Sequence, residues 1–293
     1  MGDRQLRQLA RRLWRAVLFE DRHVLCINKW PQLVVQGGTN EPSIARALPY
    51  LAQELPPKGS SGRKLVGPNH DFAPSIVHRL DKDTTGVTVI AKHAGAARIL
   101  NNLFAEHQVD KRYLAMTLGA PYPEKGRLDF PIGTNKDTGA TACITPTMSA
   151  DERSALTNVV DAATNYRVID NIDHHIALVD LKPHTGRKHQ LRVHCAQALH
   201  CPIVGDNKYG PGVTPWLSLA MRTPSKTKRK ELWSPPLFLH AARITIPRYA
   251  DHFAEIDDNS KTLKPRLDVS CPLPPWFDEV AQRLKLRLPR STT

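Results

Sequence analysis

Two short polar segments carry the residue types best suited to chemistry in this chain. The first reads His78-Arg-Leu-Asp81 and lies between two β-prone apolar runs. Cationic neighbours at this spacing can keep the Asp81 carboxylate ionised and directed, as a base or nucleophile requires. Thr84, Thr85 and Gly86 follow and predict a tight turn before the next strand. Taken alone, this local composition favours an ordinary solvated turn over a reactive site.

The second polar segment, residues 182–194, reads Lys-Pro-His-Thr-Gly-Arg-Lys-His-Gln-Leu-Arg-Val-His. A helix is predicted over residues 189–199. On such a helix His189 and Arg192 are three positions apart and share a side, so a rigid element can direct Arg192 at a partner. The alternative is a basic helix face that meets phosphate groups.

A third segment, Lys111-Arg-Tyr-Leu-Ala115, lies on a predicted strand at residues 112–118. Strand alternation places Tyr113 on the face opposite Leu114 and Met116, where its ring can face a cleft. The alternative is a half-buried tyrosine whose hydroxyl group lies in water.

Together these segments resemble the RluA type of RNA pseudouridine synthase. The family pattern runs H-R-L-D with a Thr/Ser-Gly turn, K-x-Y-x-A, T-G-R-x-H-Q-[LI]-R-V-H, P-I-x-G-D-x-x-Y and L-H-A. The chain carries these motifs in the same order, at residues 78–81, 111–115, 185–194, 202–209 and 239–241. Five ordered matches are far more specific than one motif. The family's K-P-x-G segment reads Lys29-Trp-Pro-Gln32 here, a departure that concerns the local turn rather than the chemistry.

The resemblance implies a role for each of several residues. Asp81 is the nucleophile or base that acts on the nucleoside, and whether it attacks covalently or removes a ribose proton stays open. Tyr113 stacks on the flipped uracil, and Arg192 keeps Asp81 ionised. Arg79 fills the stack that the extruded base vacates. Further residues expected at the RNA or the base are His78, Lys111, Arg187 and His189.

Neither a cofactor nor a metal is expected. Pseudouridine formation cleaves the N1 glycosidic bond and rejoins the uracil through C5, which needs no net redox change. The sequence has no Gly-x-Gly-x-x-Gly after a predicted strand and no Gly-x4-Gly-Lys-Thr/Ser. The His-rich residues 174–200 lack both His-Glu-x-x-His and a Cys pair, which disfavours a metal-dependent RNA hydrolase.

The composition fits an RNA-binding protein. The 293 residues include 41 Lys and Arg against 28 Asp and Glu, a formal charge of +13 that suits the neutralisation of phosphates. A non-catalytic RNA-binding ribosome assembly factor that retains the synthase fold has the same balance, but it needs no intact Asp81, Tyr113 and Arg192. No apolar run is long enough to cross a bilayer, so no membrane partner is expected. Five scattered cysteines indicate buried free thiols in a reduced compartment.

The resemblance implies an α/β (α+β) fold with a mixed, largely antiparallel central sheet flanked by helices. A basic amphipathic helix is expected at residues 1–18, the catalytic domain at 19–250, and a C-terminal extension with a terminal helix at 251–293. Mobile inserts are expected at about 56–74 and 210–236. Hydrophobic periodicity predicts strands at 17–19, 24–27, 33–35, 87–91, 165–169, 176–181 and 237–247, and further helices at 43–55, 96–104 and 277–288.

The N-terminal helix carries Arg4, Arg7, Arg11 and Arg15 on one face and Leu6, Leu9, Leu13 and Val17 on another. An organelle-targeting segment, an arm that touches RNA and a helix that packs on the core all fit this pattern. The core motifs look most similar to those of mitochondrial family members, and a cytoplasmic enzyme like the bacterial members is the alternative.

Target selection is expected to rest on the catalytic domain and its inserts. The residues before Phe19 leave no room for a separate RNA-binding domain. A partner complex that includes ribosome assembly factors is the alternative source of specificity. The expected substrate is ribosomal RNA of the mitochondrial large subunit, either free or in a pre-ribosomal particle.

Overall fold

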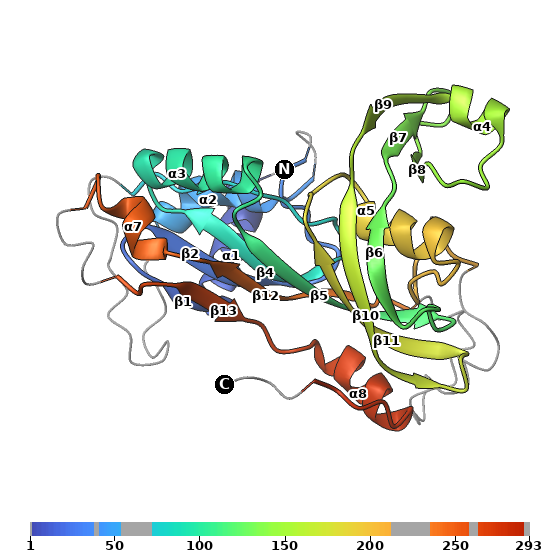
Figure 1. Ribbon diagram of the computed structural model, residues 1–293. Coiled ribbons are helices and arrows are strands. Elements are labelled where there is room, and N and C mark those ends of the chain that lie inside the picture. Colours follow the sequence, from blue (N-terminus) through green and yellow to red (C-terminus); the bar gives the residue numbers. More distant parts are fainter. Residues whose placement is uncertain (1, 38–40, 54–71, 212–234, 258–262, 290–293) are drawn as a thin grey trace. The chain divides into compact units, whose positions relative to one another are not determined.

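The computed structural model describes residues 2–37, 41–53, 72–211, 235–257 and 263–289; the expected inserts at 56–74 and 210–236 lie mainly outside these ranges. The chain divides into two compact units. Unit 1 comprises residues 1–111 and 241–271, and unit 2 comprises residues 112–240 and 272–293. The chain passes between them within β5 (Asp110–Leu118), within β12 (Leu239–Ile246) and after Cys271. The sheets are largely antiparallel and are flanked by helices, which confirms the expected fold class (Figure 1).

Unit 1 is built on a largely antiparallel sheet whose central strand is fully buried. The order is β1 (Val17–Glu20), β2 (Val24–Lys29), β4 (Thr85–Ala91) and β12, with β3 (Ser75–Ile76) beside β4 and β13 (Leu267–Ser270) beside β12. Every residue of β4 is buried, and Val87 and Val89 share a cluster with Leu100 of α3 (Ala94–Ala105). These elements confirm the predicted strands at residues 17–19, 24–27 and 87–91.

Gly86 lies inside β4 rather than in the predicted turn. Its φ of +112° favours glycine, and a Cβ atom there would lie 2.2 Å from the carbonyl oxygen of Ala241. The glycine therefore permits the close approach of β12. The turn itself is formed earlier, where the backbone N–H of Thr84 donates to the carbonyl oxygen of Asp81 at 3.2 Å.

Two packed helices, α1 (Asp3–Arg15) and α2 (Ile44–Gln53), belong to unit 1. The first ends before Val17, which lies in β1, so the predicted helix is shorter than expected. The indole N–H of Trp14 donates to the carbonyl oxygen of Leu51 at 3.2 Å. Ser43 caps α2 as predicted, because its Oγ accepts from the N–H of Arg46 at 3.3 Å.

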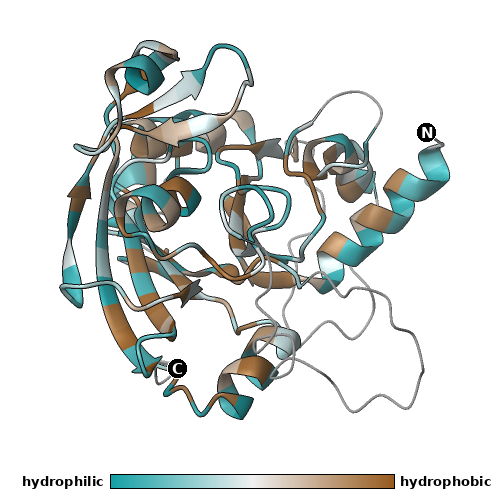
Figure 2. Ribbon diagram, turned by 90° about the vertical axis from the view of Figure 1, so that its right-hand side faces the viewer, coloured by the Kyte–Doolittle hydropathy of each residue, from teal (hydrophilic) through white to brown (hydrophobic). Residues whose placement is uncertain are grey.

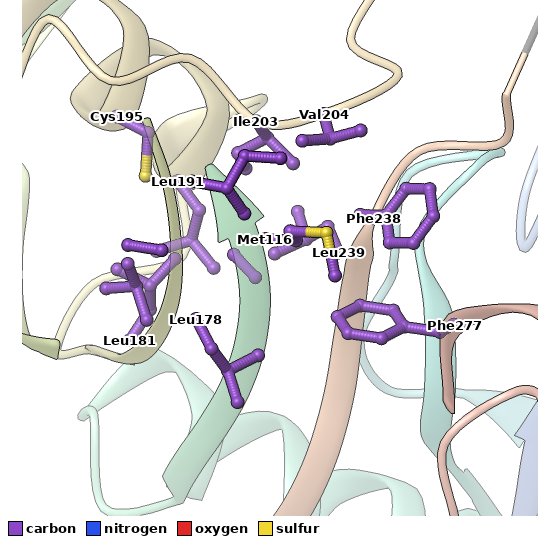
Figure 3. Packing of buried hydrophobic residues seen from close by; sticks show 14 of the residues in the cluster. Met116, Leu178, Leu181, Leu191, Cys195, Ile203, Val204, Phe238, Leu239 and Phe277 are labelled. Carbon is purple, nitrogen blue, oxygen red and sulfur yellow. The ribbon is translucent and has the colours of Figure 1, made fainter. Parts of the chain in front are cut away.

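Unit 2 has an antiparallel sheet in the order β5, β11 (Ile176–Pro183), β10 (Ala163–Ile172) and β6 (Lys125–Asp129). β10 and β11 form the predicted hairpin. Figure 3 shows the core beside this sheet, where Met116 and Leu178 lie near Phe238 and Phe277. Phe277 belongs to α8 (Pro275–Arg283), so the predicted terminal helix is confirmed, although Leu288 lies beyond its end.

A small second sheet in unit 2 was not predicted. It has the order β8 (Thr141–Cys143), β7 (Ile132–Asn135) and β9 (Leu156–Val160), with the short helix α4 (Ala150–Ser154) before β9. Four of the five residues of β9 are exposed. β9 therefore lacks the regular alternation of buried and exposed side chains that identifies a strand in a sequence.

Two predicted elements were wrong in detail. Residues 33–35 form no strand, and Val34 makes only a single bridge to Ser43. Residues 189–199 form no continuous α-helix, because α5 (Gln190–Val193) is followed by a π-helix, η1 (His194–Ala198). His189 precedes α5 in a left-handed conformation with a φ of +55°.

All five cysteines are buried and free, as expected. Burial raises the pKa of the Cys143 and Cys271 thiols to about 12, which keeps both of them protonated at neutral pH. Within the described part of the chain, no helix is long and apolar enough to span a membrane.

Candidate active-site residues

Asp81 lies on a short loop between β3 and β4, residues 77–84, which we call the Asp81 loop. Val77 and Leu80 are buried and anchor the loop in unit 1. Asp81 is partly exposed and Arg79 is exposed. The loop therefore presents a carboxylate and a guanidinium on a backbone that the buried side chains of Val77 and Leu80 hold in place.

Lys29 supports this loop and was not singled out from the sequence. Its side chain is fully buried at the end of β2. Its Nζ donates to the carbonyl oxygen of Lys82 at 2.8 Å and to that of Trp30 at 3.2 Å. Burial lowers the pKa of Lys29 to about 7, although the charges of Asp83 and Asp81 act in the opposite direction. The amine thus fastens the backbone next to Asp81 and lies within its electrostatic reach.

His78 is held as a neutral ring. Its Nε2 accepts a hydrogen bond from the backbone N–H of Val89 at 2.8 Å, so that nitrogen carries no proton. The ring stacks on Phe104 with centroids 4.5 Å apart. Burial, and then the charge of Lys111, lower the pKa of His78 to about 3. His78 therefore supplies shape and a fixed loop geometry instead of positive charge near neutral pH.

Tyr113 and Arg112 lie near the start of β5 in unit 2. Tyr113 is partly buried and packs against the hydrophobic cluster of that unit, opposite Leu181 of β11. Nε of Arg112 donates to the buried carboxylate of Asp180 at 2.9 Å. This ion pair fixes the backbone beside the tyrosine. Lys111, on the unit 1 side of the division, has its pKa lowered by burial, with Asp110 opposing.

Gln190 ties the Thr-Gly-Arg turn to β10. Its Oε1 accepts from the Thr185 hydroxyl at 2.7 Å and from the backbone N–H of Arg187 at 3.0 Å. Its Nε2 donates to the carbonyl oxygen of Ala163 and to the Thr164 hydroxyl, both at 3.0 Å. Every polar atom of this buried amide is used, so the turn that precedes Arg192 has one defined geometry.

Arg192 forms a buried bidentate ion pair with Asp206. Its Nε and Nη2 donate to the two carboxylate oxygens at 2.8 and 2.7 Å. Oδ1 of Asp206 also accepts from the backbone N–H groups of Lys208 and Tyr209, at 3.0 and 3.1 Å. The guanidinium lies over the Tyr209 ring, 5.1 Å from its centroid. A charge-assisted fork of this kind fixes the direction of the whole guanidinium group.

His189 lies beside the same pair. Its Nδ1 is 2.6 Å from the Tyr209 hydroxyl, and the two rings meet edge to face. Burial raises the pKa of Tyr209, so its hydroxyl stays protonated. Arg187 is exposed, and its Nε donates to the carbonyl oxygen of Asp161 at 3.0 Å.

The structure thus places the expected residues in two sets. Unit 1 holds His78, Arg79, Asp81 and Lys111, and unit 2 holds Tyr113, Arg187, His189 and Arg192. The sequence offered no partner for Arg192 other than the family's catalytic aspartate, because Asp206 stands out there only as part of the P-I-x-G-D motif. Among the described residues, no group of three or more His, Cys, Asp and Glu could hold a metal ion.

Comparison with known proteins agrees with the motifs. Residues 23–197 match the family model described as RNA pseudouridylate synthase. The zebrafish (Danio rerio) protein named "Pseudouridylate synthase RPUSD4, mitochondrial" is 34% identical over 96% of this chain and 76% of its own length. "Ribosomal large subunit pseudouridine synthase C" of Rickettsia prowazekii is 35% identical over 71% of this chain and 61% of its own length.

Solved structures support the same assignment. "Human RNA Pseudouridylate Synthase Domain Containing 4" superposes with a TM-score of 0.72 and 30% identity, covering 98% of this chain and 99% of that one. The matched family segment, residues 23–197, contains Asp81, Tyr113 and Arg192. The chain therefore belongs to the RNA pseudouridylate synthase family, a class of isomerases.

Proposed function

We propose that this protein isomerises specific uridines of RNA to pseudouridine, with Asp81 as the residue that acts on the nucleoside. The C1′–N1 bond breaks, the uracil turns, and a C1′–C5 bond forms. C5 loses a proton and N1 gains one, so substrate and product are isomers and no oxidant is consumed. The family match carries this proposal, because it spans Asp81, Tyr113 and Arg192.

The unit 1 residues suit the extrusion and attack of a base. A uracil in a stem must leave its stack at a cost of a few kcal/mol. Arg79 is exposed next to the Asp81 loop's buried anchors, and its long planar side chain can fill the vacated stack. Asp81 then meets the nucleoside as nucleophile or base. His78 holds the loop's shape as a neutral ring.

The unit 2 residues suit the binding of the ring and the support of negative charge. Tyr113 offers an aromatic face on which a uracil stacks. Arg192 has Nε and Nη2 bonded to Asp206, so its guanidinium group has a fixed direction. In this proposal the positive charge of Arg192 keeps the Asp81 carboxylate ionised. Lys111, Arg187 and His189 contact the RNA around the base.

We further propose large-subunit ribosomal RNA of mitochondria as the substrate. The zebrafish relative is named mitochondrial, and the Rickettsia relative is named for the large ribosomal subunit. A cytoplasmic enzyme is the alternative. Pre-ribosomal particles and ribosome assembly factors are the corresponding partners.

The test is a map of pseudouridines in mitochondrial and cytoplasmic RNA from cells with and without this protein. Loss of one or a few sites in mitochondrial large-subunit RNA, restored by wild type and not by Asp81→Asn, is the expected result. Restoration by Asp81→Asn would assign the protein a scaffold role instead. An unchanged pseudouridine map overturns the proposal. A loss of sites confined to cytoplasmic RNA would support the alternative of a cytoplasmic enzyme.

A further inference from the structure

Helix α1 carries a dense row of exposed arginines. Its 13 residues include Arg4, Arg7, Arg11, Arg12 and Arg15 but only one acid, Asp3. All five arginines are exposed. At about 100° per residue, Arg4, Arg11 and Arg15 lie on one line along the helix, with Arg7 and Arg12 on either side. We call these five residues the arginine ridge.

The opposite side of α1 is packed into unit 1. Leu6, Ala10, Leu13 and Trp14 are buried, and α1 packs on α2 through them. The indole N–H of Trp14 and the carboxylate of Asp3 both bond to α2, at Leu51 and Tyr50. Figure 2 shows α1 beside the N label, with teal and brown along its length. The helix is therefore an integral part of the fold, and its polar face has a fixed position.

Aromatic rings orient the two flanking arginines. The guanidinium of Arg12 lies 4.0 Å from the centroid of the Trp30 ring, and that of Arg7 lies 5.3 Å from the centroid of the Tyr50 ring. Such contacts orient a guanidinium group over the ring face. Because these long side chains are already partly ordered in the free protein, they lose less conformational entropy when a ligand binds.

A short series of contacts connects the ridge to the Asp81 loop. Arg12 lies on Trp30, whose carbonyl oxygen accepts from Lys29 at 3.2 Å. The same Lys29 amine donates to the carbonyl oxygen of Lys82, next to Asp81, at 2.8 Å. The end of α1 that carries Arg12 and Arg15 is therefore the end nearer the reactive loop.

We propose that the arginine ridge binds the sugar-phosphate backbone of the substrate RNA, flanking the uridine that reaches Asp81. This inference rests on the proposed function. Arginine forks bind phosphate oxygens through two parallel hydrogen bonds. At a rise of about 1.5 Å per residue, Arg4, Arg7, Arg11 and Arg15 follow one another along the helix at steps of about 4.5 to 6 Å, comparable to the separation of phosphates along a strand. Because α1 is packed into unit 1, this role belongs to the folded enzyme.

The test compares two full-length variants that lose the same charge. One carries Arg4→Gln, Arg11→Gln and Arg15→Gln. The control carries Arg248→Gln, Arg266→Gln and Lys285→Gln, three exposed basic residues on other elements. For each protein, the Kd for a uridine-containing RNA oligonucleotide is measured from 50 to 500 mM salt, and pseudouridine formation is measured for wild type and control.

The ridge variant is expected to bind RNA roughly ten- to fiftyfold more weakly near 0.15 M salt, and its salt slope is expected to fall by about 2, or roughly 0.7 for each lost phosphate contact. The control is expected to keep the wild-type slope. Equal slopes for the ridge variant, the control and wild type overturn the inference. If the salt slope falls in the ridge variant but wild type forms no pseudouridine, the proposed function is refuted and the inference that the arginine ridge binds RNA still holds.

Discussion

The Asp81 loop and the Arg192 ion pair are held in place by different means. The loop is partly exposed and is fastened through backbone atoms, by the amine of Lys29 and the N–H of Val89. Arg192 is buried and fixed through side chains, above all by Asp206. The Asp81 carboxylate thus remains accessible while the Arg192 guanidinium is pre-oriented. Substitutions at the two places should therefore separate into effects on rate and effects on stability.

The largest effect on stability is expected from Asp206→Ala. It removes the carboxylate that accepts two hydrogen bonds from the buried Arg192 guanidinium, and removing one partner of a buried ion pair costs about 3–5 kcal/mol of unfolding free energy. Chemical denaturation of wild type and variant measures the difference. A loss below about 1 kcal/mol would show that Arg192 does not depend on this pair.

The matched control is Asp206→Ala combined with Arg192→Met, which removes both charges. Replacing a whole buried ion pair by apolar groups is often close to neutral. The double variant should therefore recover most of the lost stability. Arg192→Met alone completes the set. A loss in the double variant equal to the sum of the losses in Asp206→Ala and Arg192→Met would contradict a direct coupling between these side chains.

A smaller and different effect is expected from Lys29→Met in unit 1. The carbonyl oxygens of Lys82 and Trp30 lose their donor, but the cost of burying an ammonium group disappears as well. We expect the unfolding free energy to change by about 1 kcal/mol or less, while pseudouridine formation at saturating RNA slows roughly tenfold. A variant with the wild-type rate would remove Lys29 from the support of the Asp81 loop.

The smallest effect concerns acid stability and His78. The pKa of His78 is about 3 in the folded chain and about 6.5 when unfolded, so between these values the unfolded chain holds the extra proton. The stability that neutral His78 provides is complete above pH 6.5 and declines as pH falls. Because His78 as a whole residue is partly exposed, we expect wild type to lose only about 1 kcal/mol more than His78→Gln between pH 7 and 4.5. The exposed His174→Gln is the control, and identical pH profiles would contradict a neutral, anchored His78.

Hydrophobic periodicity was enough to predict most of the secondary structure. It located β2, β4, α3, β5 and the β10–β11 hairpin, because their buried positions repeat with a clear period. It failed over residues 125–160, where strands such as β9 are short and largely exposed. It also gave a continuous helix over 189–199, because the left-handed His189 and the π-helix that follows α5 leave no signal in the spacing of apolar residues.

The candidate site residues were predictable as motifs, but their supports were not. Asp81, Tyr113 and Arg192 stand at family positions that a sequence displays directly. The burial of Lys29 and the Arg192–Asp206 fork arise only when distant segments pack together. Gln190 lies inside the family motif at residues 185–194, yet two of its four hydrogen bonds depend on the position of β10. Tertiary packing, which local spacing does not encode, produces these contacts.

The central claim is that the Asp81 carboxylate performs the chemistry and does not merely help to bind RNA. Single-turnover pseudouridine formation by Asp81→Asn, measured beside its RNA affinity, tests this most directly. The amide keeps the shape of the side chain but lacks its charge and basicity. We predict that product formation is abolished while the Kd for RNA stays within about threefold of wild type. A threefold change in Kd is less than about 1 kcal/mol of binding free energy, since a factor of ten corresponds to about 1.4 kcal/mol. A turnover rate within a few-fold of wild type would contradict the assignment of Asp81.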